Sequence, residues 1–490
     1  MTPVAMGGTL MLKTTRTAMR SQALMTRRRL LATASGGAAF AGLASCAGLP
    51  QANTGPWSEA DAILARIRPP MIPRRDFQIA SFGARPESDC TAAIAGAIDA
   101  ASRAGGGRVV VPAGVWSTGA IRLRSHVELN VAKGATLKFS RDPNAYLPAV
   151  LTRHEGIELM NYSPFIYAYG QEDIALTGEG TLDGQADADH WWDWGRRARD
   201  GASGDRARLA NMGEQGVPVD QRIFGEGTFI RPNFVQPYRC RNVLIEGLTV
   251  IASPMWEIHP VECSNVIVRG LNINSHGPNN DGCDPESCRD LLIEDCTFDT
   301  GDDCIAIKSG RNNEGRRLKV PTENVVIRNC RMKDGHGGFT LGSECTAGIR
   351  SVFVENCRMD SPNLDNALRF KNNAMRGGTL ENIYLRNISI GQVAGAVINV
   401  DYSYGEGPNG PYTPVFRNMV IENLTSQKSR RAVSLQGYAN APLEGITLRG
   451  CRFDNAGEPG PLRNLKGLTT ERVTVNGQAF SPPANIGDAP

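Results

Sequence analysis

The sequence predicts an all-β protein: a single-stranded right-handed parallel β-helix with one capping helix near its N-terminus. Three observations favour this fold. A motif of two short alternating strands recurs along the chain, Gly, Asn or Asp interrupts each copy, and reactive residues keep a nearly constant phase to the motif. The 490 residues can form one solenoid, because a solenoid grows lengthwise and needs no second core.

The repeat is clearest in the second half of the chain. Asn242–Val250 (NVLIEGLTV) is followed by related segments with start-to-start spacings of 23, 25, 34, 27, 31, 36 and 27 residues. These begin at Asn265, Asp290, Asn324, Ser351, Asn382, Asn418 and Gly445. Each copy alternates apolar and polar residues, breaks, and alternates again, which is typical of two short strands joined by a corner. A leucine-rich repeat has a similar period but requires a regular leucine skeleton, which this sequence lacks.

The N-terminal residues 1–47 predict an export signal. Arg27, Arg28 and Arg29 precede a mild apolar run of small residues, and this pattern resembles a twin-arginine signal. The segment Leu-Ala-Ser-Cys that ends at Cys46 resembles a lipoprotein cleavage box, with simple signal cleavage after residue 47 as the alternative. We therefore expect a periplasmic, outer-membrane-anchored or extracellular protein, with a possible lipid anchor at Cys46.

The rest of the chain divides into three parts. Residues 48–74 are rich in Pro and Arg towards their end and predict a linker, and residues 75–475 predict the β-helix. Within the β-helix, Thr91–Arg103 reads as a helix with Thr91 as its N-cap, which would cover the open apolar end of the solenoid. Residues 476–490 predict a loose C-terminal tail.

Two irregular stretches interrupt the repeats. Residues 184–231 contain Trp191, Trp192 and Trp194, which indicate either a platform for sugar stacking or a hydrophobic clamp that holds the loop. Residues 310–317 lengthen one coil. Insertions into a solenoid map to one face, often the binding face, so both stretches point to where a ligand binds.

Composition excludes several classes of function. The formal net charge of only +3 gives no electrostatic support for nucleic-acid binding. The twelve cysteines include no Cys-x-x-Cys pair that would suggest zinc. Four of them occupy apolar positions of the repeat, where a free thiol behaves as a small hydrophobe: Cys296, Cys330, Cys357 and Cys451. The other cysteines of the mature chain cannot be assigned from the sequence.

Reactive residues follow the repeat in phase. Asp281, Asp303, His336 and Arg369 lie 16, 13, 12 and 18 residues after the starts of their repeats. Because stacked strands lie about 4.8 Å apart, residues at similar phases of successive coils form one cluster on one face. Three carboxylates, one histidine and two cations in this region predict a hydrolytic site for an anionic substrate.

The motifs around these residues resemble those of the polygalacturonase family of pectin-degrading glycoside hydrolases (glycoside hydrolase family 28). That family carries Asn-Thr-Asp, Gly/Gln-Asp-Asp, Gly-His-Gly and Arg-Ile-Lys, in this order. The corresponding segments here are Asn279-Asn280-Asp281, Gly301-Asp302-Asp303, Gly335-His336-Gly337 and Arg369-Phe370-Lys371. The two departures, Asn280 and Phe370, are not residues that do chemistry. The resemblance covers roughly residues 75 to 475 and implies an inverting hydrolase of α-1,4-linked galacturonic acid that needs no metal or other cofactor.

Residue roles follow from the chemistry and from the resemblance. Inverting hydrolysis needs one protonated carboxyl for the leaving oxygen and one ionised carboxylate for the water. Three close aspartates cannot all ionise easily, so one pKa rises and supplies the acid, although the sequence does not show which carboxyl keeps the proton. By resemblance the acid is Asp302, while Asp281 and Asp303 hold and deprotonate the water.

The remaining candidate residues surround this trio. His336 is expected to hydrogen-bond to the acid and tune its protonation. Arg369 offers a bidentate clamp for a uronate carboxylate, and Lys371 a point charge beside it. Asn279 is expected to orient Asp281 or the substrate. For the carboxylates the competing interpretation is a calcium site.

The substrate is expected to be a pectic polysaccharide or an oligogalacturonide, and the protein a monomer. Residues 337–344 and the extended loop at 311–317 resemble exo-acting members, in which long loops block one end of the cleft; an endo mode stays open. Alternatives within the family are rhamnogalacturonan or xylogalacturonan hydrolysis. A Ca²⁺-dependent pectate lyase-like β-helix is an alternative of another reaction class, and a β-helical carbohydrate-binding or adhesin module is one without catalysis.

Overall fold

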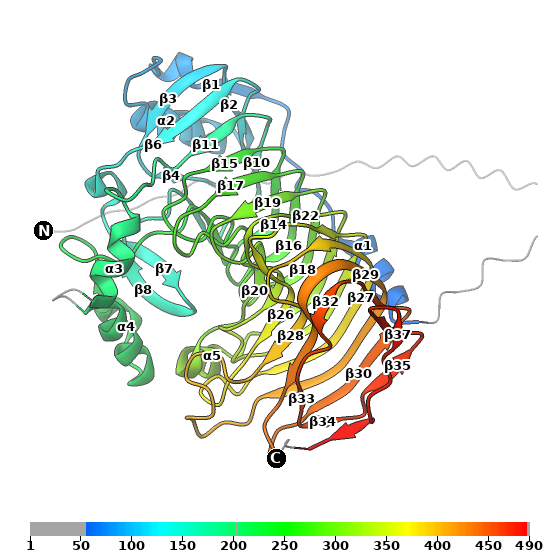
Figure 1. Ribbon diagram of the computed structural model, residues 1–490. Coiled ribbons are helices and arrows are strands. Elements are labelled where there is room, and N and C mark those ends of the chain that lie inside the picture. Colours follow the sequence, from blue (N-terminus) through cyan, green and yellow to red (C-terminus); the bar gives the residue numbers. More distant parts are fainter. Residues whose placement is uncertain (1–54, 201–203, 488–490) are drawn as a thin grey trace, which may run out of the picture. The chain divides into compact units, whose positions relative to one another are not determined.

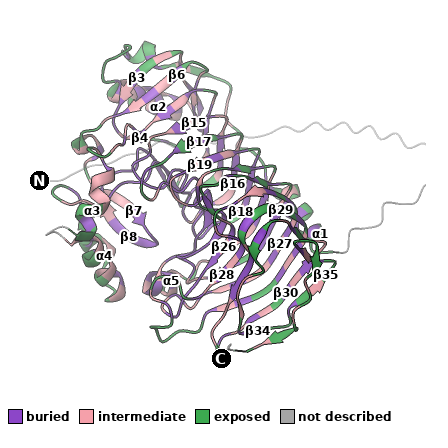
Figure 2. Ribbon diagram, viewed as in Figure 1, coloured by how far each residue is buried: buried purple, intermediate pink, exposed green. Residues whose placement is uncertain are grey.

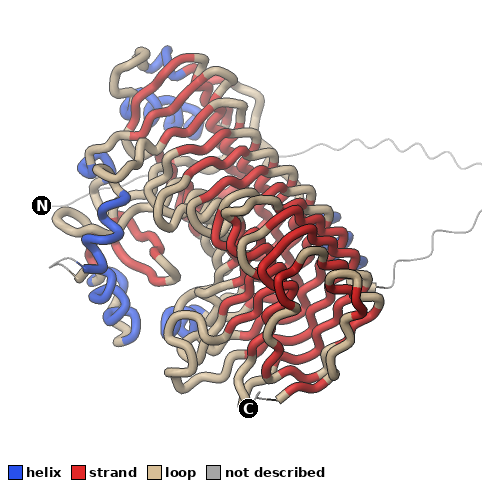
Figure 3. The backbone as a smooth tube through the Cα atoms, in the orientation of Figure 1, coloured by secondary structure: helices blue, strands red, loops and turns tan. Residues whose placement is uncertain are grey.

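The computed structural model describes residues 55–200 and 204–487, and these form a parallel β-helix (Figures 1 and 3). The predicted fold is confirmed. The predicted export signal and Cys46 lie outside the described residues. No helix in the described ranges is long and apolar enough to cross a membrane.

Three ladders of parallel strands run along the solenoid. The first contains β1 (Asp76–Gln78), β2 (Gly107–Val111), β5 (Val127–Val131), β10 (Glu172–Thr177), β14 (Arg241–Glu246), β16 (Ser264–Arg269), β18 (Arg289–Glu294), β21 (Thr322–Arg328), β24 (Ile349–Glu355), β27 (Thr379–Gln392), β29 (Val415–Gln436), β30 (Leu443–Arg449), and, both paired with β30, β34 (Leu465–Lys466) and β35 (Thr469–Glu471). The second contains β3 (Gly114–Thr118), β6 (Ala135–Phe139), β11 (Thr181–Asp183), β15 (Thr249–Ile251), β17 (Asn272–Ser275), β19 (Thr297–Thr300), β22 (Arg331–Met332), β25 (Arg358–Met359), parts of β27 and β29, β31 (Arg452–Phe453) and β36 (Thr474–Val475).

The third ladder carries part of the candidate site. It contains β4 (Ile121–Arg122), β9 (Ile166–Tyr169), β13 (Val235–Tyr238), β20 (Ile305–Ile307), β23 (Gly335–Leu341), β26 (Leu364–Lys371), β28 (Ala396–Asp401), the end of β29, β32 (Ala456–Glu458) and β33 (Leu462–Arg463). Isolated bridges at Ile258 and Cys283 continue it between β13 and β20.

A polar ladder explains why so many repeats begin with Asn or Asp. Asn242, Asn265, Asp290 and Asn324 all adopt positive φ, a conformation that Asn and Asp tolerate better than most residues. Their side chains also bond from coil to coil: the Asn265 amide donates to Asn242 Oδ1 at 2.8 Å, and the Asn324 amide donates to Asp290 Oδ1 at 2.9 Å. An Asn or Asp at this position therefore adopts the backbone conformation of the corner and also forms a side-chain hydrogen bond to the equivalent residue of a neighbouring coil.

The interior is apolar and includes a row of thiols. Cys296, Cys330, Cys357 and Cys451 are buried and unpaired, as their repeat positions predicted. The other seven described cysteines, whose environment the sequence left open, are buried free thiols as well. Figure 2 shows that burial follows the inner face of the strands.

Helix α2 (Thr91–Arg103) forms at the predicted position and contributes Ile94, Ala97 and Ile98 to the core. The N-cap prediction is wrong in detail. Thr91 is the first helical residue, and Cys90 occupies the N-cap position without a side-chain hydrogen bond. The preceding residue, Asp89, accepts from the backbone N–H of Thr91 through Oδ1 at 2.9 Å.

The prediction of a linker over residues 48–74 is wrong for Trp57–Arg66, which form helix α1. This helix covers an apolar stripe on the outer face of the first ladder, to which Leu244, Ile267, Leu292, Val326 and Phe353 each contribute one residue per coil. The repeat strands carry three successive apolar residues because the central one faces outward. The uncovered stripe would be costly in water, so a covering element was required.

The C-terminal tail is not loose where it is described. Within the predicted tail, β37 (Gln478–Ala479) pairs antiparallel with β36, and β38 (Asn485–Ile486) pairs antiparallel with β34. These antiparallel pairings occupy the exposed edge of the last coil and so end the solenoid.

The two irregular stretches build substructures on one side of the solenoid (Figure 1). The first forms α3 (Trp192–Asp200), α4 (Asp205–Glu214) and β12 (Ile223–Phe224); β12 joins the antiparallel hairpin β7 (Val150–His154) and β8 (Ile157–Asn161). The second forms α5 (Asn312–Leu318). Short 3₁₀ turns occur at Ile79–Phe82, Pro143–Tyr146 and Val219–Gln221.

We predict that Trp57→Ala lowers the free energy of unfolding by about 3–5 kcal/mol, as removal of a buried aromatic ring does in other cores. Trp57 is buried, packs edge-on against Phe353 at 5.7 Å, and lies under the Arg386 guanidinium. Denaturant unfolding followed by circular dichroism measures the change. Trp57→Phe is the matched control and should lose much less; equal losses would show that the ring contacts of α1 do not anchor it.

Candidate active site

The structure brings the three aspartates of the predicted site together. Asp281 follows β17, and Asp302 and Asp303 follow β19 on the next coil. One carboxylate oxygen of each lies within 4.8 Å of the others. Backbone hydrogen bonds hold the two turns in register, since the N–H of Gly282 donates to the carbonyl of Asp303 at 3.0 Å. The phase argument therefore placed these residues correctly.

Asp303 is the ionised member of the trio. Burial alone would raise its pKa, but the cations of Lys371, Arg369 and Lys308 hold the pKa of this fully buried carboxyl well below its usual range. Lys371 Nζ donates to Oδ2 at 2.6 Å and Arg369 Nη1 donates to Oδ1 at 3.1 Å. Gly337 makes room for this arrangement, because a Cβ there would lie 2.7 Å from Asp303 Oδ1.

These contacts revise the expectation of a two-cation clamp. Lys371 and Arg369 lie on one face of β26, as predicted, but both bind Asp303 rather than standing free. The Lys371 side chain is only 5% exposed, whereas that of Arg369 is 17% exposed and lies over the Tyr404 ring. Arg369 is thus partly exposed, whereas Lys371 is nearly buried but still lines the pocket that holds Asp281 and Asp302.

His336 contacts Asp302 as expected. Its Nδ1 lies 2.9 Å from Asp302 Oδ1, and this hydrogen bond raises the pKa of His336 above its ordinary value. The Asp302 side chain is 18% exposed, against 4% for Asp281 and none for Asp303. Asp302 is therefore the carboxyl most open to a ligand.

Asp281 faces a buried lysine that the sequence analysis missed. Burial, and then the charge of Asp302, raise the pKa of Asp281 well above its usual range, while Lys308 opposes them with its Nζ 3.6 Å from Oδ2. Lys308 also pairs with Glu344 at 3.3 Å and lies over the Trp256 ring at 4.4 Å. A signal was present, since Lys308 directly follows the apolar strand β20 and keeps the phase of the other site residues.

Two more buried carboxyls lie beneath Asp281. Burial raises the pKa of Glu257 and of Asp284 well above the usual range, in both cases reinforced by the charge of Asp281. Neither carboxyl has a hydrogen-bond partner among the described residues. Both are thus held in the neutral form, and Lys308 is left to neutralise Asp281 and Glu344.

Asn279 and Asn280 lie at the turn before Asp281 and have different environments. Asn279 accepts from Arg231 Nη2 at 2.6 Å, so it is fixed by a residue of the insertion and lines the pocket above the aspartates. Asn280 is fully buried; its Oδ1 accepts from Ser275 Oγ at 2.7 Å and from the N–H of Gly277 at 2.8 Å. These bonds shape the turn that presents Asp281.

The three tryptophans of the insertion divide between the two predicted roles. Trp191 is 1% exposed and packs with Tyr146, Phe165 and Trp194, so it is a hydrophobic clamp. Trp192 lines a small cavity, and its indole N–H donates to the Ser253 carbonyl at 2.9 Å. A three-ring stacking platform is therefore excluded.

Asp281 and Asp302 line a pocket of about 540 Å³. Its walls come from separate insertions that ion pairs join together. Glu155, between β7 and β8, binds Arg206 of α4 at 2.7 Å and Arg311, just before α5, at 3.0 Å. Arg311 also lies 3.7 Å from Glu406, which binds Arg376 at 3.2 Å. A connected set of loops thus forms part of the pocket wall.

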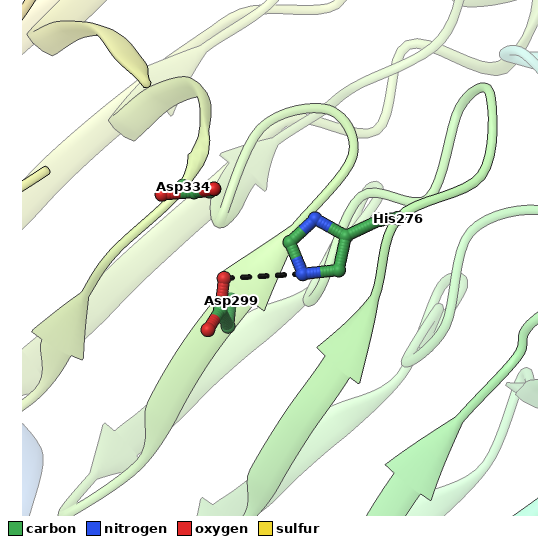
Figure 4. A group of neighbouring side chains, drawn as sticks. All are labelled: His276, Asp299 and Asp334. Carbon is green, nitrogen blue, oxygen red and sulfur yellow. Dashed lines mark ion pairs between the residues drawn. The ribbon is translucent and has the colours of Figure 1, made fainter. Parts of the chain in front are cut away.

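A second cluster of carboxylates and histidine adjoins this site (Figure 4). His276 Nε2 lies 3.2 Å from Asp299 Oδ1, and the two carboxylates of Asp299 and Asp334 lie close by. Lys333 Nζ binds the other oxygen of Asp299 at 3.3 Å, and Asn363 donates to Asp334 at 3.1 Å. These groups are satisfied within the protein and brace the turns that carry Asp302 and His336.

Fold and site together define a class of protein. Clustered carboxylates in a cation-rich pocket on a parallel β-helix are the equipment of a glycoside hydrolase for acidic sugars. Buried ammonium groups already compensate Asp281 and Asp303, which disfavours the competing calcium interpretation because a cation would have to displace them.

Comparison with known proteins identifies the family. The sequence profile described as "Glycosyl hydrolases family 28" matches residues 225–471, and the chain belongs to this family. It is therefore a glycosidase of the polygalacturonase family, as the motifs predicted. The alternatives from outside the family, a Ca²⁺-dependent pectate lyase-like enzyme and a non-catalytic module, are not favoured.

Individual relatives are consistent with this family assignment. The crystal structure of a hyperthermoactive exopolygalacturonase from Thermotoga maritima is 43% identical, with a TM-score of 0.82, over 86% of this chain and 96% of that one. A probable polygalacturonase of Vitis vinifera is 29% identical over 70% of this chain and 66% of its own length. An exo-poly-alpha-D-galacturonosidase of Dickeya chrysanthemi is 27% identical over 83% of this chain and 75% of its own length.

We predict that His336 titrates above its ordinary pKa of about 6.5, and that Asp302→Asn lowers this pKa by removing the charged hydrogen-bond partner. NMR titration of the histidine rings measures both values. The ring signals of His126, on a distant coil, serve as the internal reference. An unchanged His336 pKa in the variant would contradict the coupling.

Proposed function

We propose that the protein is an exo-acting polygalacturonase that hydrolyses α-1,4-galacturonosidic bonds of polygalacturonate and oligogalacturonides with inversion. The observation that carries this proposal is the trio of close aspartates, two of which, Asp281 and Asp302, line a pocket walled by the insertions. The exopolygalacturonases among the relatives support the chain-end mode.

Asp302 is the proposed general acid. A donor must reach the leaving oxygen, and Asp302 is the most exposed of the three carboxyls. With Asp303 held ionised, one proton remains to be placed within the cluster. A neutral His336 can accept a hydrogen bond from protonated Asp302. After Asp302 has given its proton to the leaving oxygen, His336 can take up a proton from solvent and, as a cation, stabilise the new carboxylate.

Asp281 and Asp303 are proposed to hold and deprotonate the attacking water. Burial and the charge of Asp302 raise the pKa of Asp281, and the positive charge of Lys308 opposes this rise and so favours the ionised form that the base role requires. The oxygens of the trio approach more closely than the roughly 6.5–9.5 Å typical of an inverting pair. Two carboxylates that share the water can still place it opposite the leaving group, so inversion is a prediction that product stereochemistry must test.

The exo mode follows from the walls of the pocket. Arg311 connects the ion pairs of Glu155 with those of Glu406, so the insertions form one continuous wall of the pocket. We expect this wall to admit a polymer only by its end. Cations on these walls, with Arg369 near the aspartates, suit a uronate carboxylate.

We also propose export by the twin-arginine route, with lipidation of Cys46 or simple signal cleavage. The sequence pattern of residues 1–47 supports this, and a polymeric pectic substrate fits a site of action outside the cytoplasm. A monomer suffices for the proposed chemistry, because one chain supplies every residue of the site.

We predict that Asp302→Asn lowers kcat on trigalacturonate by about 100- to 10,000-fold while the protein stays folded. The amide keeps the shape but cannot donate the required proton. Asp295→Asn, at an exposed turn position, is the matched control and should be fully active. In the wild type, proton NMR should show the β anomer as the first product; the α anomer first would overturn inversion.

We predict that Lys308→Met shifts the acid limb of kcat/KM upward by about one to three pH units. Burial and Asp302 already raise the pKa of Asp281, and loss of the opposing ammonium raises it further, so the base ionises only at higher pH. Lys333→Met, which removes an exposed lysine from Asp299, is the control. An unmoved acid limb would show that Lys308 does not set the charge of Asp281.

A further inference from the structure

A cavity of about 160 Å³ lies beside the catalytic pocket and shares Glu155, Arg206 and Asn279 with its lining. One wall comes from the insertion, through Trp192 of α3 and Arg231. The opposite wall comes from the β7–β8 hairpin and the turn before Asp281. The mechanism proposed above uses no residue that belongs to this cavity alone.

Arg231 is the unusual feature of the cavity. It is 4% exposed, yet it forms no ion pair among the described residues. Its guanidinium donates to the carbonyls of Pro254 at 3.0 Å and Pro278 at 2.6 Å, and to Asn279 Oδ1 at 2.6 Å. All three acceptors are uncharged. A buried cation without a counter-charge is costly, which is the pattern expected of a site that an anion completes.

The surroundings leave this positive charge uncompensated. Glu155 is the nearest carboxylate of the lining, but Arg206 and Arg311 already share it, at 2.7 and 3.0 Å. Burial lowers the pKa of Arg231 to about 10, which still leaves it charged at neutral pH. Arg311 also lies 3.7 Å from Glu406, so among these three guanidinium groups only Arg231 lacks an ion pair within the described residues.

The cavity also offers groups that suit a sugar. His154 is 6% exposed, and its Nδ1 has no hydrogen-bond partner in the described part of the chain. Burial lowers the pKa of His154 to about 4, so the ring is neutral and can bond a hydroxyl group. Trp192 adds an apolar surface of the kind that packs against a pyranose face.

We propose that this cavity is a carboxylate-specific subsite, in which Arg231 and Arg206 bind the uronate group of the chain-terminal galacturonosyl unit. The subsite rests on the proposed function and deepens it. A terminal residue anchored by its own charge beside the pocket places the adjoining glycosidic bond over the aspartates. Chain-end cleavage then depends on the charge of the terminal uronate group as well as on steric exclusion by the loops.

Trigalacturonate and two singly methyl-esterified forms, one esterified at each terminal residue, test the subsite. In the wild type, the ester at the bound terminus should raise KM by about 10- to 100-fold relative to trigalacturonate, because it removes a charge-assisted pair of hydrogen bonds. The ester at the other terminus should leave KM unchanged. Arg231→Gln retains donors for the carbonyls but lacks the charge. Arg231→Gln should raise KM for trigalacturonate. The ratio of KM for the substrate esterified at the bound terminus to KM for trigalacturonate should then fall close to one.

The controls separate the possible failures. Arg241→Gln, an exposed arginine paired with Glu172, should keep the wild-type ratio. If Arg231→Gln does not fold, Arg206→Gln carries the test, because its side chain is 42% exposed and less needed for stability. A ratio unchanged in a folded variant, or a wild type that ignores both esters, overturns the subsite. A wild type that fails to hydrolyse trigalacturonate overturns the proposed function itself.

Discussion

The structure depends on the constant register between successive coils. Val243, Val266, Leu291, Val325 and Val352 pair one above another, so each coil repeats the position of the last. This register turns a spacing in sequence into a distance in space. It places Asp281 beside Asp302 and Asp303, and β26 beside them all. Without it, residues about ninety positions apart would not share one pocket.

Within the β-helix, the positions of the lysines and arginines determine which buried carboxyl groups are ionised. Five carboxyls, Asp281, Asp284, Asp303, Glu257 and Glu344, are buried near one another, and only Lys308, Lys371 and the nearby arginines offset them. Asp303 and Glu344 are stabilised as anions, whereas Glu257 and Asp284 stay neutral. Asp302, which is partly exposed, is left to exchange a proton with a ligand. The asymmetry arises from the positions of two lysines rather than from the aspartates themselves.

Periodic features could be predicted from the sequence, and aperiodic ones could not. The β-helix, helix α2, the core thiols and the aspartate cluster all follow from a repeat that can be counted. Helix α1 and the paired tail break that repeat, although the triple apolar strands already required a cover like the one α1 provides. Arg231 and Glu155 lie in insertions whose ion pairs join distant segments, and no spacing rule reports such contacts. Lys308 kept the phase, but it directly follows the apolar strand β20 and belongs to none of the motifs that marked the other site residues.

The products formed from polygalacturonate test the central claim most directly. Digestion with a chelator present, followed by chromatography and by absorbance of unsaturated uronides, reports cleavage mode and reaction type together. The account predicts saturated monomer or dimer alone from the earliest time points, because the pocket walled by the insertions is expected to admit only a chain end. A ladder of saturated oligomers would contradict this role of the wall, and unsaturated products that require Ca²⁺ would contradict the roles of the three aspartates.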